Sequence, residues 1–323
     1  MIGVCCINRI ALSLAHITCI WQLYFKFFRT FADFLSNGIG VRPVGSNALW
    51  LAGEYIFKRM EDLGLNPEEQ PFVYTDKDGL EYNLFNVVGE IKATEKEERV
   101  IVFCAHYDTV PTSKGGIDNT TGVALVMTLA KALTDILRGN GEKTETLKNL
   151  NKTTTYRFIA LAGEEVGCVG SKAYLTRTTK EEKAKIFAAL NFDMFISKLE
   201  DDSALVLNTM GGYENGEYVS GTDEKPFDNV ISKAVVKGVN EYEKESGKSF
   251  EVWSPRNYGH SDHQSFHENN IESANVTIRG SRRVNGKLPD GYHSPKDVYD
   301  ENLFKMDECE FFVECVLRAV FYI

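Results

Sequence analysis

The most constraining feature of this chain is a short, continuous apolar stretch that ends in a histidine. Residues 100–105 are all apolar or small, and His106 and Asp108 follow at once. A run of this length without polar alternation predicts a strand buried on both faces, as in a parallel sheet. Ligands of open α/β sheets bind just beyond the carboxyl ends of such strands. His106 and Asp108 therefore leave the predicted strand where a functional site is expected.

A glycine-rich segment follows the predicted strand and carries another carboxylate. Asp118 lies between Gly115 and Gly122, directly before a run in which apolar residues recur at helical spacing. A histidine and a carboxylate brought together at a strand end can form half of a metal site. One His-x-Asp pair is by itself more typical of a simple hydrogen bond, so the metal interpretation depends on later stretches.

Three later stretches supply the missing ligand types. Glu164 and Glu165 follow an apolar strand, Asp193 ends another, and His293 lies on a loop before Ser-Pro. Each has an ordinary explanation when taken alone: a solvated acidic turn, a capping aspartate or a surface histidine. Buried carboxylates need a partner, however, and these side chains recur at the same kind of place.

Together the candidates form a set of imidazole and carboxylate groups that suits zinc, with one glutamate left over. The set comprises His106, Asp118, Glu164, Glu165, Asp193 and His293. If Asp118 bridges, each of two metals receives one histidine, one terminal carboxylate and the shared aspartate, and keeps an open position. Two metals about 3.5–4 Å apart can clamp an attacking oxygen and polarise a scissile carbonyl. The remaining glutamate can move a proton, and Asp108 can fix the tautomer of His106.

Composition narrows the remaining classes of function. The 323 residues are 43% hydrophobic and 25% charged, which is ordinary for a soluble globular protein. The formal charge is −10 and Lys and Arg do not cluster, which argues against a nucleic-acid partner. The seven cysteines include no Cys-x-x-Cys pair, and their odd, sparse distribution is not that of a disulfide framework.

The rest of the chain reads as alternating strands and amphipathic helices. A helix capped near Ser46 and ended by Gly64 is predicted over 47–63, and two strands are predicted around the Asp78-Gly79 turn. The polar segment 139–155 is predicted to be an exposed loop and an insertion. His260, His263 and His267 share the spacing of one helix face, and a solvated loop leading into a short helix explains His260 and His267 well.

The N-terminal residues 1–23 are expected to form an apolar extension outside the main domain. The stretch from Ile10 to Phe25 is interrupted by His16 and Gln22 and lacks a clean small-x-small cleavage site. An anchor, a signal peptide, an extra helix and an early start codon all stay open. Localisation is therefore left open between cytoplasmic and secreted or membrane-anchored, and membrane association is expected only if this stretch is an anchor.

The ordered motifs resemble those of the aminopeptidase Y-type (bacterial leucyl aminopeptidase-like) family of co-catalytic zinc exopeptidases. The motifs are His106-Tyr-Asp108, Gly116-Ile-Asp118-Asn, Gly163-Glu164-Glu165-x-Gly167, Asn191-Phe-Asp193, Ser261-Asp262-His263-x-x-Phe266 and Tyr292-His293-x-Pro295-x-Asp297. The likeness runs from about Val41 to the C-terminus. It implies a single α/β domain over residues 24–323, with a mixed, largely parallel sheet sandwiched between helices.

The resemblance also implies a ligand set for two Zn²⁺ ions per chain. His106 and Asp193 would be the terminal ligands of one zinc, and Glu165 and His293 those of the other. Asp118 would bridge the two ions. Manganese or cobalt would accept much of the same set, so the native metal is left open.

The same resemblance assigns roles in catalysis. Glu164 would be the general base, Asp108 would support His106, and Tyr258 or Tyr292 would hydrogen-bond the tetrahedral oxyanion. The implied activity is removal of N-terminal residues from short peptides through a metal-activated water. A dipeptidase, a carboxypeptidase, a glutaminyl cyclase and a non-catalytic binding homologue are the alternatives. Side-chain preference and oligomeric state are left open.

Overall fold

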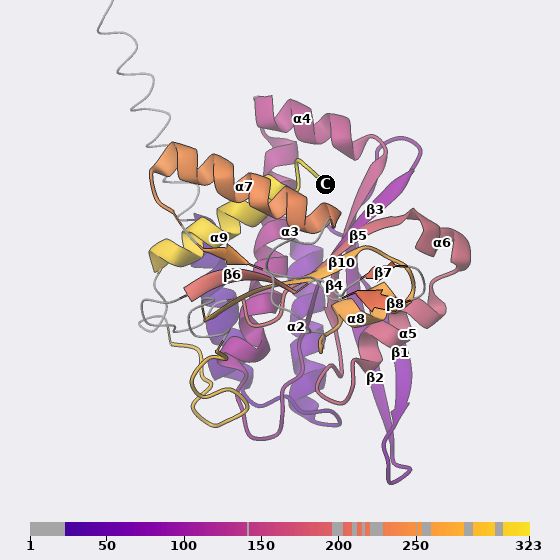
Figure 1. Ribbon diagram of the computed structural model, residues 1–323. Helices are drawn as coiled ribbons and strands as arrows, with labels where there is room; N and C mark the ends of the chain where they lie inside the picture. The colour runs from indigo at the N-terminus through magenta and orange to yellow at the C-terminus, as the bar shows by residue number, and fades with distance from the viewer. Residues whose placement is uncertain are drawn as a thin grey trace, which may run out of the picture.

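An eight-stranded mixed sheet runs through the centre of the molecule, in the order β1-β2-β4-β3-β5-β10-β6-β9 (Figure 1). The computed structural model describes residues 23–140, 142–195, 203–208, 212–214, 217–219, 229–249, 251–253, 260–280, 287–300 and 306–323. The strands are β1 Glu68–Thr75, β2 Glu81–Ile91, β3 Arg99–His106, β4 Thr154–Leu161, β5 Ile186–Asn191, β6 Ser203–Asn208, β9 Val252–Trp253 and β10 Ser273–Gly280. A separate two-stranded sheet pairs β7 (Gly212–Glu214) with β8 (Glu217–Val219).

The four central strands are parallel. β3 pairs in parallel with β4 and with β5, and β10 pairs in parallel with β5. β1, β2 and β6 run antiparallel to their inner neighbours. The predicted mixed, largely parallel α/β sheet is confirmed, and its geometry places the carboxyl ends of β3, β4 and β5 side by side at one edge.

Helices cover both faces of the sheet. The helical segments are residues 23–33, η1 Phe34–Ile39, α2 Asn47–Asp62, η2 Gly116–Thr121, α3 Gly122–Arg138, α4 Glu142–Asn151, α5 Val169–Arg177, α6 Lys180–Lys185, α7 Val230–Ser246, α8 His263–Glu268 and α9 Met306–Ala319. The main core lies between the sheet and α2, α3, α7 and α9, and a smaller core lies under α5 and α8. The predicted helix over 47–63 is confirmed, and the Ser46 hydroxyl accepts from Leu49 N at its start.

Helix α3 lies next to the central strand and is buried over most of its length. The stretch Gly116–Arg138, which combines η2 and α3, is long and apolar enough to cross a membrane, but 78% of its most apolar window is buried inside the fold. Its burial is what a core helix of an α/β domain requires. Because α3 starts directly after η2, packing of α3 against β3 also fixes the position of the Asp118 segment.

The prediction that residues 139–155 form an exposed loop is wrong. Most of this segment is α4, and β4 already begins at Thr154. Leu147 is fully buried in the main core, and the Asn151 amide donates to Lys92 O and Thr154 O. A helix that buries so few apolar residues shows too little periodicity to be recognised from sequence.

Some predictions concern residues outside the described part of the chain. They are the oxyanion role of Tyr258 and the extension at residues 1–23, of which residues 1–22 lie outside the described part. The proposed domain boundary after residue 23 stays a prediction.

Candidate active site

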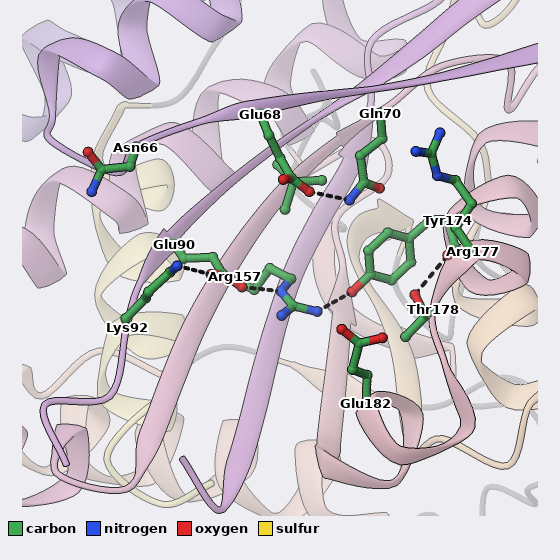
Figure 2. Close-up of a pocket in the computed structure, with 11 residues that line it drawn as sticks. Asn66, Glu68, Gln70, Glu90, Lys92, Arg157, Tyr174, Arg177, Thr178 and Glu182 are labelled. Atoms are coloured by element: carbon green, nitrogen blue, oxygen red, sulfur yellow. Dashed lines mark hydrogen bonds and ion pairs between the residues drawn. The ribbon is translucent and has the colours of Figure 1, made fainter. Parts of the chain in front are cut away.

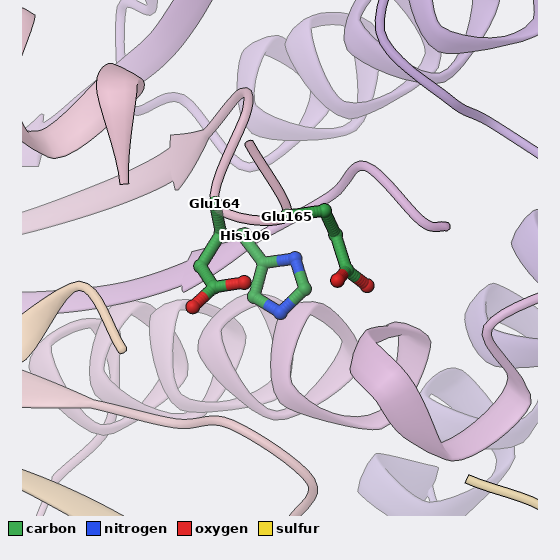
Figure 3. Close-up of side chains that lie close together, drawn as sticks. All are labelled: His106, Glu164 and Glu165. Carbon is green, nitrogen blue, oxygen red and sulfur yellow. The ribbon is translucent and has the colours of Figure 1, made fainter. Parts of the chain in front are cut away.

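Three parallel strands deliver side chains to one point at the sheet edge. His106 is the last residue of β3, Glu164 and Glu165 follow β4 after a turn, and Asp193 follows β5. Figure 3 shows the two glutamates leaving one loop on either side of the His106 ring. The turn depends on Gly163, whose φ of 81° is a conformation that most residues avoid.

Two groups of ligand atoms meet at Asp118. His106 Nε2 lies 3.2 Å from Asp118 Oδ1 and 3.5 Å from Asp193 Oδ1. His293 Nε2 lies 3.2 Å from Asp118 Oδ2 and 3.3 Å from Glu165 Oε2. Asp118 therefore turns one carboxylate oxygen to each histidine, which is the arrangement of a bridging ligand. All the predicted ligands are brought together.

The spacing of these atoms fits a metal better than direct hydrogen bonds. Four ligands held at 2.0–2.2 Å in a tetrahedron lie about 3.3 Å from one another. In addition, His106 Nε2, Asp193 Oδ1 and Glu165 Oε1 are buried and have no hydrogen-bond partner among the described residues. Buried polar atoms nearly always have a partner, so these orphaned donors and acceptors fit a pair of zinc ions.

Asp108 ties the histidine to the glutamate loop. Its Oδ1 lies 3.4 Å from His106 Nδ1 and accepts from Glu164 N, while Oδ2 accepts from Glu165 N, both at 3.1 Å. With Nδ1 facing a carboxylate, Nε2 of His106 is free to bind a metal. Asp108 thus contacts His106, the residue it is expected to support, and also fixes the backbone of both glutamates.

The Asp118 segment is fixed to the His293 loop by Asp297. The Asp297 carboxylate accepts from Ile117 N at 2.6 Å and from Asp118 N at 3.2 Å. Gly116 makes this approach possible, because a Cβ there would lie 2.2 Å from the backbone of Val298. The sequence motif around His293 includes Asp297 but gives it no role. The hydrogen-bond partners of Asp297 are backbone groups, which a sequence motif does not reveal.

Glu164 lies beside both ligand groups. Its carboxylate is within 4.8 Å of ligand atoms of His106 and Glu165, and its Oε1 is 3.7 Å from the Cys168 thiol, a neighbour that sequence reasoning missed. Burial raises the pKa of Glu164 well above its usual value, and Asp193 adds to the effect. A buried carboxyl group with a raised pKa is suited to exchange protons near neutral pH.

The pKa shifts of the ligand side chains also indicate that cations are stabilised at this site. Burial, followed by the charge of Asp118, raises the pKa of Glu165 to about 8. Burial opposes ionisation of Asp118, but His106 and His293 outweigh it and lower the pKa to about 2. Burial opposes protonation of His106 as well, yet the surrounding aspartates raise its pKa well above the usual value. Positive charge at this point is strongly favoured.

Comparison with known proteins places the chain among peptidases. The model of the family described as Peptidase family M28 matches residues 86–313, more than half of the chain. The chain belongs to peptidase family M28. The match confirms the family resemblance that the ordered motifs suggested.

The M28 chain also resembles individual proteins. It is 29% identical over 213 residues to aminopeptidase YwaD of Bacillus subtilis, covering 66% of this chain and 39% of the relative. It is 31% identical over 149 residues to leucine aminopeptidase 2 of Trichophyton rubrum, covering 45% and 27%. The chain therefore spans less than half the length of these curated relatives.

Solved structures share the fold of this M28 member. BSAP, a zinc aminopeptidase from Bacillus subtilis, matches with a TM-score of 0.71 at 18% identity over 91% of this chain and 94% of that chain. A glutaminyl cyclase from Porphyromonas gingivalis matches with a TM-score of 0.66 at 17% identity, over 91% and 96%.

Tyr292 lies at the margin of the site in this M28 member. Its ring stacks on His293 with centroids 3.8 Å apart, and the residue is 38% exposed. Burial and the carboxylate cluster raise the pKa of Tyr292, so its phenol stays protonated and can donate. Tyr292 is therefore the oxyanion donor candidate that lies within the described residues.

His263 is not brought to the metal ligands but is buried at the start of α8, 1% exposed. Burial, with repulsion from His267 and Arg279, lowers its pKa from 6.5 to about 3. Below pH 6.5 the His263 imidazole therefore binds a proton in the unfolded chain but stays neutral in the folded chain. The contribution of His263 to the unfolding free energy is fully present above pH 6.5 and is lost as the pH falls toward 3.

We expect His263→Leu to flatten the acid sensitivity of folding. Between pH 7 and pH 5 the wild type should lose about 2 kcal/mol more of its unfolding free energy than the variant. Urea unfolding at both pH values measures the difference. Exposed His260, changed to leucine, controls for the loss of a histidine. Equal losses in wild type and His263→Leu would contradict the expectation.

Proposed function

We propose that this chain is a two-zinc aminopeptidase that removes the N-terminal residue from short peptides. The observation that carries the proposal is Asp118, whose two oxygens face His106 and His293 at 3.2 Å each. A carboxylate shared in this way supports a pair of metals rather than one. Asp193 and Glu165 complete the two groups.

In the proposed reaction two bound zinc ions supply Lewis acidity for the scissile carbonyl and the attacking water. Glu164 accepts the proton of that water as the C–O bond forms. It then gives the proton to the leaving amine as the C–N bond breaks. Asp108 keeps His106 and the glutamate backbone in place, and the Tyr292 phenol donates to the oxyanion.

The choice of the N-terminal peptide bond is supported by the relatives. YwaD and the Trichophyton enzyme are named aminopeptidases, and BSAP is described as a zinc aminopeptidase. The glutaminyl cyclase neighbour has the same fold, so cyclisation is the second candidate reaction. Cyclisation differs from hydrolysis because it needs a polarised carbonyl but no activated water.

Matched peptides separate these reactions. The zinc-loaded full chain is given leucyl-glycyl-glycine, its N-acetylated form, its C-amidated form and a peptide that begins with glutamine. We expect release of leucine from the free and C-amidated peptides and none from the acetylated peptide. Mass spectrometry identifies every product.

Other outcomes would reject the proposal. Cleavage of the acetylated peptide at its C-terminus would indicate a carboxypeptidase. Cleavage of the dipeptide leucyl-glycine, assayed alongside, with all the tripeptides left intact would indicate a dipeptidase. Loss of ammonia from the glutamine peptide without cleavage would indicate a cyclase. No turnover by a chain that holds two zinc ions would favour a binding homologue.

A further inference from the structure

Arg42 is a fully buried arginine next to the site, and its guanidinium group makes five hydrogen bonds. Its Nε donates to Tyr107 O (2.9 Å), its Nη1 to Leu35 O (2.9 Å), Gly40 O (2.6 Å) and Lys114 O (3.1 Å), and its Nη2 to Thr120 Oγ1 (2.9 Å). Its backbone also exchanges two hydrogen bonds with Thr109. An arginine offers five donors in a rigid plane, which suits it to hold several acceptors in fixed positions.

The acceptors show what Arg42 holds. Tyr107, Thr109, Lys114 and Thr120 all belong to the segment 107–120, which begins next to His106 and contains Asp118. Arg42 contacts this segment at its start, in its middle and at its end. The other two acceptors lie at the end of the N-terminal helical region, so Arg42 joins that region to the metal-ligand segment.

The charge of Arg42 acts on the site without a direct ion pair. No carboxylate lies within ion-pair distance of Arg42 in the part of the chain that the structure describes. Burial lowers the pKa of Arg42 to about 10 and nearby aspartates oppose this, so the group is cationic at neutral pH. Asp108, Asp297 and Asp118 are the aspartates concerned.

We propose that Arg42 is a positioning residue that fixes the segment 107–120 and thereby holds Asp118 where it bridges two metal ions. Asp297 holds the same segment from the His293 side, so Asp118 is fixed from two directions. Arg42 precedes residues 86–313, which match the M28 model. Because Arg42 positions a metal ligand, the region before that match is also part of the catalytic unit. The inference rests on the proposed two-metal function.

The test compares Arg42→Met, Arg42→Lys and a matched control. Arg157 is also a largely buried arginine, bonded to Glu90 and Tyr174 beside a separate pocket of about 270 Å³ (Figure 2). Its hydrogen bonds go to Glu90 and Tyr174 and to none of the predicted metal ligands, so Arg157→Met controls for loss of a buried guanidinium group. We expect kcat to fall about 100-fold in Arg42→Met, less in Arg42→Lys, and less than about threefold in Arg157→Met, with KM little changed.

Electron paramagnetic resonance of the Mn²⁺-loaded proteins gives a readout besides activity. A bridging carboxylate couples two Mn²⁺ ions, so the wild type and Arg157→Met should show a coupled pair. Arg42→Met should show uncoupled Mn²⁺. If Arg42→Met does not fold, Thr120→Val removes one acceptor with little change in volume and should weaken the coupling in the same direction.

The outcomes separate this inference from the proposed function. A coupled pair and wild-type kcat in Arg42→Met, or in Thr120→Val where Arg42→Met fails to fold, would overturn the role of Arg42 and leave the metal pair intact. Uncoupled or single Mn²⁺ in the wild type would overturn the metal pair and this inference with it.

Discussion

Replacing Glu164 with glutamine is expected to remove nearly all turnover and to leave the bound zinc in place. Glutamine has the same shape but cannot accept the proton of the attacking water. General-base catalysis contributes about 10²–10⁴-fold, so kcat should fall by about that factor. Glu164 also belongs to neither of the two groups of ligand atoms that share Asp118, so the metals held there should stay.

Steady-state kinetics and zinc analysis of the same sample check this expectation. Glu165→Gln is the matched control, because it changes the neighbouring residue and removes a predicted ligand 3.3 Å from His293. It should lose zinc as well as activity. A Glu164→Gln variant that keeps kcat within about tenfold of wild type would reject the assignment of the base, given the usual size of such effects.

Replacing Asp118 with alanine is expected to affect both metals at once. Its two oxygens take part in both ligand groups, so each zinc loses a ligand and the charge that compensates its own. Loss of outer partners alone weakens metal binding about 10–100-fold, and loss of a shared ligand should exceed that. The variant should hold less than one zinc after dialysis and show no measurable hydrolysis.

Asp193→Ala is the comparison for this experiment. Asp193 faces His106 and not His293, so its removal should weaken one zinc and spare the other. Elemental analysis after dialysis against a defined free-zinc buffer gives the stoichiometry of each variant. Equal zinc retention in Asp118→Ala and Asp193→Ala would contradict a bridging role for Asp118.

Sequence reasoning found the strands and their terminal residues because buried parallel strands are easy to recognise. His106, Glu164 and Asp193 each follow a short apolar run, and parallel strands must end at the same edge. Which histidine pairs with which carboxylate depends on side-chain geometry that no local pattern records. That pairing came from the family resemblance and agrees with the distances in the structure.

The residues that hold the ligands could not be predicted in the same way. Arg42 and Asp297 bond mainly to backbone groups, several of them in the Asp118 segment, and these come into reach only when distant segments fold together. Helix α4 was missed because it buries too little apolar surface for a clear period. Supporting contacts of this kind require the tertiary structure.

Anomalous diffraction at the zinc edge, from crystals of the zinc-loaded protein, tests the proposed pair of metal ions. We expect two peaks about 3.5–4 Å apart, on either side of the Asp118 carboxylate. One should lie beside His106 and Asp193, and the other beside Glu165 and His293. A single peak, or zinc bound away from Asp118, would contradict it.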